Sequence, residues 1–213
     1  MKLPIGLVTI LELHEEVFGG VLPEAGMWRN INVRIEGANF SPPRMEKVIP
    51  MMEELIEQYR IMDTRGDDVF QVASWFHCNF EKIHPFRDGN GRVGRLLLNL
   101  HLLKHNWPPI HILPNDRNDY LNALTSAGNG DLDPMIQLFQ RLMGASILDL
   151  LDRAGTADDE LLDLKKASSL VPYHPDYLGL RCKQGELPGV LSEHRWMTSE
   201  RALKIYMALK GRK

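Results

Sequence analysis

The segment from Arg92 to His105 is apolar on nearly every face of a helix, and it directly follows an unusually polar stretch. A helix with this pattern must be buried on most sides, so it predicts the centre of a larger helical body. The stretch before it, KIHPFRDGNGRVGR, is dense in charged, amide and glycine residues. Placing such polar groups against a core costs free energy unless they find partners. The two segments together constrain the fold and indicate where a binding site would lie.

Amphipathic patterns around this segment predict the rest of a helical bundle. The expected helices cover residues 5–18, 44–60, 68–82, 92–105, 115–127 and 132–152. Pro50 should kink its helix or delay the start, because proline lacks the N–H that a helix interior needs. One stretch, from Trp28 to Gly37, alternates apolar and polar residues before a glycine, which predicts a strand or a short hairpin.

Composition agrees with a soluble globular protein, because 44% of the 213 residues are apolar and 25% are charged. The cysteines, Cys78 and Cys182, lie outside any C-x-x-C spacing, which argues against a disulfide scaffold or zinc knuckle and fits a reducing cytoplasm. The apolar run near the N-terminus meets Glu12 too soon for a signal peptide or a membrane span, so no membrane partner is expected.

The net charge of −3 conceals an asymmetry, since residues 165–213 carry +6 and residues 1–164 carry −9. A basic tail on an acidic body suggests two modules with different partners. We therefore expect a main domain over residues 1–153, a polar linker over 154–166 and a small domain over 167–213.

The loop after Ile83 has the features of a phosphate site. His84 precedes a proline, so the helix before it must end there. Gly89 and Gly91 permit backbone angles that point several amides at one spot, and the apolar helix begins at the same place with its free N–H groups. Arg92 and Arg95 add two cations on one face of the first turn.

Asp88 and His84 complete the predicted chemistry. A single carboxylate beside a polyphosphate is well placed to hold Mg²⁺. His84 is the group in the loop that can accept a proton near neutral pH. Asp-Gly-Asn-Gly taken alone is more typical of a turn and a helix cap, and no Walker loop is present in the chain.

The run from His84 to Arg95 resembles the signature of the Fic family, H-P-F-x-[DE]-G-N-G-R-x-x-R, at every fixed position. Supporting similarity extends over about residues 5–150. The resemblance implies an all-α helical bundle, the Fic fold, with a β-hairpin flap beside the active site. It also implies transfer of AMP from ATP to a hydroxyl side chain of a target protein, with release of pyrophosphate.

The same resemblance implies the role of each motif residue. His84 would deprotonate the target serine, threonine or tyrosine, and Asp88 would bind Mg²⁺ between the α- and β-phosphates. The phosphates would be held by Gly89, Asn90, Gly91, Arg92 and Arg95. The flap that aligns the target by strand addition would comprise Asn32, Val33, Arg34, Ile35 and Glu36.

The resemblance says less about which residues recognise the adenine base of the nucleotide. Tyr120 stands where relatives carry an aromatic residue of the nucleotide pocket, although an ordinary core tyrosine is an equal alternative. Gly128 stands where some relatives carry an asparagine, so the chain departs from the family pattern there.

Three alternatives stay open at this point. The enzyme could use another nucleotide donor or remove AMP, or the chain could be a DNA-binding regulator that senses nucleotide. Many Fic proteins are restrained by a helix with the motif [S/T]-x-x-x-E-[G/N], whose glutamate pairs with the second motif arginine. Thr156 to Glu160 has this spacing but is followed by Leu161, so an inhibitory partner protein or another device would have to supply any restraint.

The tail predicts a helix starting at Pro175, strands at Val190–Leu191 and Arg195–Met197, and a closing helix capped by Thr198. Its apolar positions, Ala202, Leu203, Ile205 and Tyr206, should face inward. This pattern is similar to winged helix-turn-helix modules of the excisionase and MerR type, which implies DNA binding. The candidate contacts are Arg181, Lys183, Arg195 and Arg201; a basic module for protein contacts is the alternative.

Two further histidines, His101 and His105, stand four residues apart, a spacing that can hold a metal ion. No glutamate occupies the H-E-x-x-H position and leucines lie between them, which favours structural histidines. His14 is isolated in the sequence.

Overall fold

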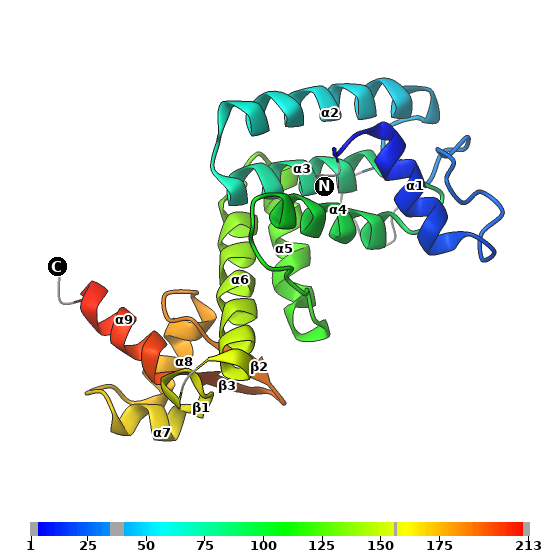
Figure 1. Cartoon of the computed structure of the whole chain (residues 1–213). Helices are drawn as coiled ribbons and strands as arrows, with labels where there is room; N and C mark the ends of the chain where they lie inside the picture. Colours follow the sequence, from blue (N-terminus) through cyan, green and yellow to red (C-terminus); the bar gives the residue numbers. More distant parts are fainter. Residues whose placement is uncertain (1–3, 35–40, 156, 211–213) are drawn as a thin grey trace. The chain divides into compact units, whose positions relative to one another are not determined.

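The computed structural model describes residues 4–34, 41–155 and 157–210. The chain divides into two compact units (Figure 1). The N-terminal unit comprises Met1–Pro109 and Arg117–Ile136, and the C-terminal unit comprises Ile110–Asp116 and Gln137–Lys213. None of the helices in the described residues has the length and apolar character that crossing a membrane requires.

In the described residues of the N-terminal unit, all regular structure is helical. Its elements are α1 (Leu7–Phe18), the short 3₁₀ helix η1 (Met45–Lys47), α2 (Val48–Arg65), α3 (Val69–Ile83), α4 (Asn90–Lys104), α5 (Arg117–Gly128) and the first turn of α6 (Asp133–Ala154). α3 lies between α2 and α4, and α1 packs on α4 (Figure 1). All six predicted helices are therefore confirmed, with boundaries shifted by a few residues.

α4 has the central position that its sequence predicts. Val93, Leu97, Leu98 and Leu102 are all buried. The helix is not covered on every side, because Leu103 keeps 55% of its surface exposed. The same core includes residues of α1, α2 and α3, so one continuous apolar interior supports the start of α4.

Pro50 delays the start of its helix, as predicted. η1 comes first, and α2 then begins at Val48, so the proline lies in the first turn where its missing N–H has no helical partner to lose. α3 starts with Asp68 as its cap, whose side chain accepts a 2.9 Å hydrogen bond from the amide of Gln71.

The strand predicted from Trp28 to Gly37 is wrong for its described part, since residues 28–34 form no strand. The backbone there is held by a side chain instead of a neighbouring strand: Arg29 donates to the carbonyls of Ile31 at 2.9 Å and of Pro43 at 2.6 Å. The predicted β-hairpin flap is therefore not seen up to Arg34, and Ile35 and Glu36 lie outside the described residues.

The C-terminal unit combines short helices with a three-stranded antiparallel sheet. Besides the rest of α6, it contains η2 (Pro114–Asp116), η3 (Ala157–Asp159), β1 (Leu162–Asp163), α7 (Leu164–Ser169), α8 (Pro175–Lys183), β2 (Val190–Ser192), β3 (Arg195–Thr198) and α9 (Glu200–Lys210). The strand order is β1-β3-β2, with Leu162 opposite Thr198 and Val190 opposite Met197. The hairpin turns through Glu193 and His194, both with positive φ.

The tail elements are confirmed, with two corrections. Ile205 does not face inward but keeps 52% of its surface exposed, because the buried stripe of α9 consists of Ala202, Leu203 and Tyr206. The cap of α9 is Ser199, whose hydroxyl accepts from the amide of Ala202, whereas the Thr198 hydroxyl donates to the Pro188 carbonyl.

The domain boundaries stay a prediction. The described part of the stretch predicted as a linker, residues 154–166, contains η3 and β1, and β1 pairs with β3 of the C-terminal sheet. Residues on both sides of the predicted linker thus contribute to the same unit.

Candidate active site

The polar loop between α3 and α4 is closed by the side chain of Asn90. Its Oδ1 accepts from the amide of Phe86 at 2.8 Å, and its Nδ2 donates to the Phe86 carbonyl at 2.9 Å. Asn90 is 2% exposed, so these bonds lie away from water. The residue predicted to hold phosphate therefore contributes its backbone to the loop surface, while its side chain fixes the shape of the loop.

Phe86 anchors the loop to the core. Its ring is fully buried and stacks on His14 with centroids 3.8 Å apart and on Trp28 at 5.1 Å. The Gly26 amide donates to Nδ1 of His14, so Nε2 carries the hydrogen and donates to the Asp88 carbonyl at 3.1 Å. His14, isolated in the sequence, thus contacts the loop across 74 positions, which its place along the chain did not reveal.

The first turn of α4 is open to an anion. Its cap is Gly89 with a φ of 82°, and no side chain caps the amides that follow. A Cβ at Gly89 would lie 2.4 Å from the Phe18 ring, so only glycine fits here. Uncapped amides at the positive end of a 15-residue helix attract phosphate oxygens.

Charged side chains surround this turn. Arg92 lies over the Phe18 ring at 4.3 Å and makes a loose ion pair with Asp88 at 3.6 Å. The Asp88 side chain is 64% exposed, so its carboxylate can reach a cation. Arg95 makes no ion pair or hydrogen bond with any described residue, which leaves its guanidinium to a ligand.

His84 is arranged to act as a base. It ends α3 in the left-handed region at a φ of 51°, which turns its side chain back toward the helix end. Nδ1 lies 3.3 Å from the Glu81 carbonyl, which can only accept, so Nδ1 carries the hydrogen and the lone pair is on Nε2. Burial and the nearby Arg29 charge lower the pKa of His84 below 6.5, against opposing contributions from the Glu81 carbonyl and Asp88.

Arg29 is a site residue that the sequence did not reveal. It is 5% exposed, and its Nε donates to the His84 carbonyl at 2.8 Å. Its backbone amide donates to the Pro85 carbonyl at 2.9 Å. Arg29 thus joins the segment expected to form the flap to the histidine loop, and it lies in a stretch with no motif spacing of its own.

Only some of the residues predicted to recognise the nucleotide base and the target protein lie at the site. Asn32 accepts from the amide of Met45 at 2.9 Å, and Val33 and Arg34 follow it without regular structure. Tyr120 is 9% exposed, and its hydroxyl bonds at 2.9 Å to His77, whose other ring nitrogen contacts the Gly94 carbonyl. Tyr120 therefore connects α5 to α3 and α4.

A cavity of about 250 Å³ lies between α3 and the α5–α6 turn. Trp75 and Leu124 give it apolar walls, and Glu81 and Lys82 bring charge to it. Gly128 lines it too, and a Cβ at that position would touch nothing within 4 Å. The space beside Gly128 is therefore open.

Asp63, His101 and His105 come together at the ends of α2 and α4, with ligand atoms within 4.8 Å of one another. Asp63 is already bound by Lys104 at 2.6 Å and by His105 at 2.8 Å. Both ring nitrogens of His101 are engaged, one by the Tyr59 hydroxyl and one by the Val69 carbonyl. In this structure the three side chains are thus held by one another and by neighbouring protein groups.

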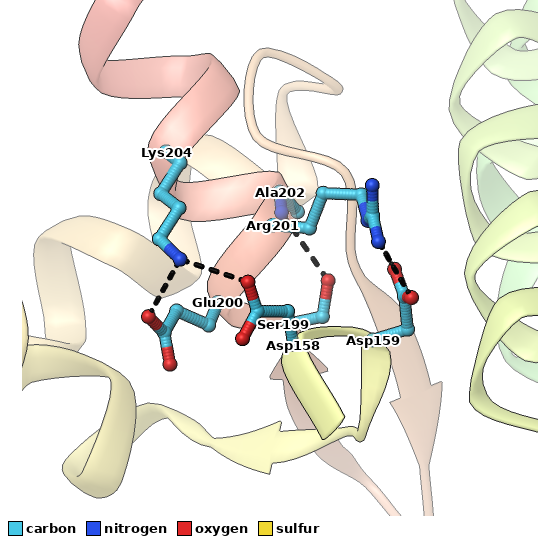
Figure 2. A network of polar contacts seen from close by, with 7 residues as sticks. All are labelled: Asp158, Asp159, Ser199, Glu200, Arg201, Ala202 and Lys204. Atoms are coloured by element: carbon cyan, nitrogen blue, oxygen red, sulfur yellow. Dashed lines mark hydrogen bonds and ion pairs between the residues drawn. The ribbon is translucent and has the colours of Figure 1, made fainter. Parts of the chain in front are cut away.

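The four basic residues predicted to contact DNA differ in their surroundings. Arg201 pairs through Nη2 with Asp159 at 2.9 Å, and Asp159 is 1% exposed (Figure 2). Arg181 bonds to Glu186 at 2.8 Å and lies over the Tyr177 ring. Lys183 and Arg195 are exposed.

Lys204 adds a second contact beside Arg201, since it reaches both Asp158 and Glu200 at 2.9 Å (Figure 2). The basic residues at the start of α9 therefore fasten this helix to η3.

Comparison with known proteins identifies relatives of this arrangement. The model of the Fic/DOC family matches residues 4–102. The chain is 32% identical over 160 residues to the protein adenylyltransferase fic-1 of Caenorhabditis elegans, a match that covers 75% of this chain and 31% of that protein. It is 35% identical over 138 residues to the protein adenylyltransferase Fic of Nematostella vectensis, covering 64% and 32%. The chain thus spans about a third of the length of these curated relatives.

A solved structure supports the fold. A Fic-domain-containing signalling protein from Bacteroides thetaiotaomicron matches with a TM-score of 0.64 at 25% identity, over 72% of this chain and 65% of that one.

Proposed function

We propose that the chain is a protein adenylyltransferase, which transfers AMP from ATP to a hydroxyl side chain of a target protein, because residues 4–102 match the Fic/DOC family model and the fold is similar to that of a solved Fic-domain protein. One observation carries the proposal: a histidine with a free Nε2 lone pair stands in the same short loop as an uncapped helix start, two arginines and an exposed carboxylate. Relatives that match most of the chain are named protein adenylyltransferases.

His84 acts as the general base in this proposal. Its Nε2 takes the proton from the target hydroxyl, and the oxygen then attacks the α-phosphorus of ATP. The bond from that phosphorus to the bridging oxygen breaks, and pyrophosphate leaves. The lowered pKa keeps His84 neutral and able to accept the proton at pH 7.

The phosphates lie at the start of α4, where the amides of Asn90 and Gly91 and the guanidinium groups of Arg92 and Arg95 balance their charge. The amide of Gly89, predicted to join them, donates to Oδ1 of Asp88 at 2.5 Å and would have to exchange this acceptor for a phosphate oxygen. Asp88 would hold Mg²⁺, which would neutralise charge on the α- and β-phosphates. An exposed carboxylate suits this ion, because Mg²⁺ prefers oxygen ligands and keeps most of its waters.

The adenine ring of ATP occupies the cavity between α3 and the α5–α6 turn. The apolar walls of Trp75 and Leu124 suit a flat ring, and the opening at Gly128 leaves room for it. Tyr120 supports this cavity from the core through its bond to His77. The target segment would align along residues 32–36, the predicted flap, in the reducing cytoplasm that the free cysteines favour.

Incubation with α-labelled ATP, Mg²⁺ and cell extract tests the proposal. We expect labelled protein bands with the wild type and with His111→Ala, a matched histidine variant at an exposed position, and no bands with His84→Ala. Nucleotide binding without transfer in the wild type would instead support a nucleotide-sensing regulator. Label that enters proteins from another nucleotide, or leaves pre-labelled protein, would support a different donor or removal of AMP.

DNA binding by the C-terminal unit is a second proposal, favoured by the +6 charge of residues 165–213 and by a helix pair followed by a β-hairpin. That element order is the one expected of a winged helix-turn-helix module. Lys183 and Arg195 are the better candidates for contacts, because Arg181 and Arg201 already have acidic partners.

A mobility-shift titration of the whole chain against its own promoter DNA at low salt tests the second proposal. A shift that Lys183→Ala and Arg195→Ala together weaken would support it, and no shift would contradict it. An inhibitory partner is tested by comparing the transfer rate of the purified chain before and after addition of extract.

A further inference from the structure

Glu81 is a buried carboxyl group without a partner. Its residue is 8% exposed on α3, and it forms no ion pair with any described residue. Its Oε1 has no hydrogen-bond donor in the described part of the chain. Such a group costs free energy to keep, so its position calls for a physical reason.

The position is directly behind the first turn of α4. A Cβ at Gly94 would lie 2.5 Å from Oε1 of Glu81, so the carboxyl group fills the space that this glycine leaves. A Cβ at Gly91 would lie 3.9 Å from the same oxygen and 3.3 Å from Nη1 of Arg95. The carboxyl group and the guanidinium group therefore converge on one point beside Gly91, yet they form no ion pair.

The surroundings make Arg95 the effective countercharge. Burial raises the pKa of Glu81 to about 7, and the Arg95 charge acts in the opposite direction. The other titratable groups that face this region are His77, Cys78 and Lys82 on α3 and Tyr120 on α5. Burial lowers the pKa of His77 to about 4 and raises the pKa values of Cys78 and Tyr120, so these three are neutral at pH 7.

We propose that Glu81 is a positioning residue for Arg95: when ionised it draws the guanidinium group toward α3, and when protonated it leaves the group to a bound anion. For nucleotide binding, the inference rests on the proposed function. Phosphates that take over Arg95 deprive Glu81 of its countercharge, so nucleotide binding takes up a proton at Glu81. Affinity for ATP therefore falls as pH rises through the range in which Glu81 ionises.

A titration without nucleotide tests the coupling itself. The side-chain ¹³C carboxyl resonance of Glu81, assigned by its loss in Glu81→Gln, is followed against pH in the wild type and in Arg95→Gln. We expect its midpoint to move to higher pH in Arg95→Gln, because the countercharge is gone. An unchanged midpoint would overturn the proposal, whatever the protein does with nucleotides.

The second measurement is the dissociation constant of Mg-ATP at pH 6 and pH 8. Between these values the wild type should lose up to about tenfold in affinity relative to Glu81→Gln, since a group titrating near pH 7 goes from mostly protonated to mostly ionised. Protonation of ATP and of His84 affects both proteins equally, so it cancels in the ratio of their two dissociation constants. Glu54→Gln, an exposed carboxyl on α2, should behave as the wild type.

The outcomes separate the two claims. Equal pH dependence in the wild type and Glu81→Gln would overturn the coupling to nucleotide. Absence of ATP binding at both pH values in all variants would refute the proposed function, and the carboxyl titration would still decide whether Glu81 and Arg95 are coupled. Melting temperatures within a few degrees of the wild type show that the isosteric glutamine has not disrupted the fold.

Discussion

Replacing Asn90 by alanine should disrupt the phosphate loop more than any surface change in it. The substitution removes both hydrogen bonds to Phe86, at 2.8 and 2.9 Å, from a site that water does not reach. Leaving the buried Phe86 amide without an acceptor costs about 1–3 kcal/mol, and the second bond adds about 1 kcal/mol. We therefore expect Asn90→Ala to lose about 2–4 kcal/mol of unfolding free energy.

Urea unfolding followed by tryptophan fluorescence measures this loss, because Trp28, Trp75 and Trp107 all lie in the N-terminal unit. Hydrogen exchange at the Phe86 amide localises it, since protection there should fall in the variant. Asn129→Ala, at an exposed turn, is the matched control and should change stability by less than about 0.5 kcal/mol. A loss below that value for Asn90→Ala, with Phe86 still protected, would refute the argument.

Three further predictions concern other groups. Since the pKa of His84 lies below 6.5, the acid limb of kcat/KM should fall below that pH, and a limb centred above it would contradict the assignment of the base. Burial raises the pKa of Glu81 to about 7 in the folded state, against 4.5 for an exposed glutamate, so the folded state binds a proton that the unfolded state has released. The free energy of unfolding should therefore fall by about 3 kcal/mol as pH rises from 4.5 to 7. Urea titrations at both pH values should show this fall in the wild type and not in Glu81→Gln. Arg201→Ala should lower the melting temperature of the C-terminal unit clearly more than Lys204→Ala, because Arg201 pairs with the buried Asp159 whereas Lys204 makes only exposed pairs; equal shifts in thermal unfolding would contradict this difference.

The helices were predictable because their signals are local. Apolar residues at three- and four-residue spacing produce the same buried stripe in any helical bundle. Pro50 and Pro85 set the start of α2 and the end of α3, because a proline restricts the backbone only within about one turn of its own position. The motif loop was predictable for a related reason, since its glycines, arginines and histidine lie within twelve residues of each other.

The misjudged features depend on contacts between distant residues. The alternation from Trp28 onward indicates a strand only if a partner strand is beside it, and here Arg29 binds the loop after α3 instead. His14 meets Asp88 across 74 positions, which no spacing rule detects. Glu81 looks like one more polar residue of a helix, and only the packing of Gly94 shows that it is buried.

The most direct test of the account is to follow the backbone amide resonances of the chain while Mg-ATP is added. If the start of α4 holds the phosphates, the largest shifts will occur at Asn90, Gly91 and Arg92, and they will disappear in Arg95→Gln or require far more ATP. Shifts that leave these three amides unchanged and gather at another cavity, such as the one between α1 and α2 lined by Glu57 and Arg60, would contradict it.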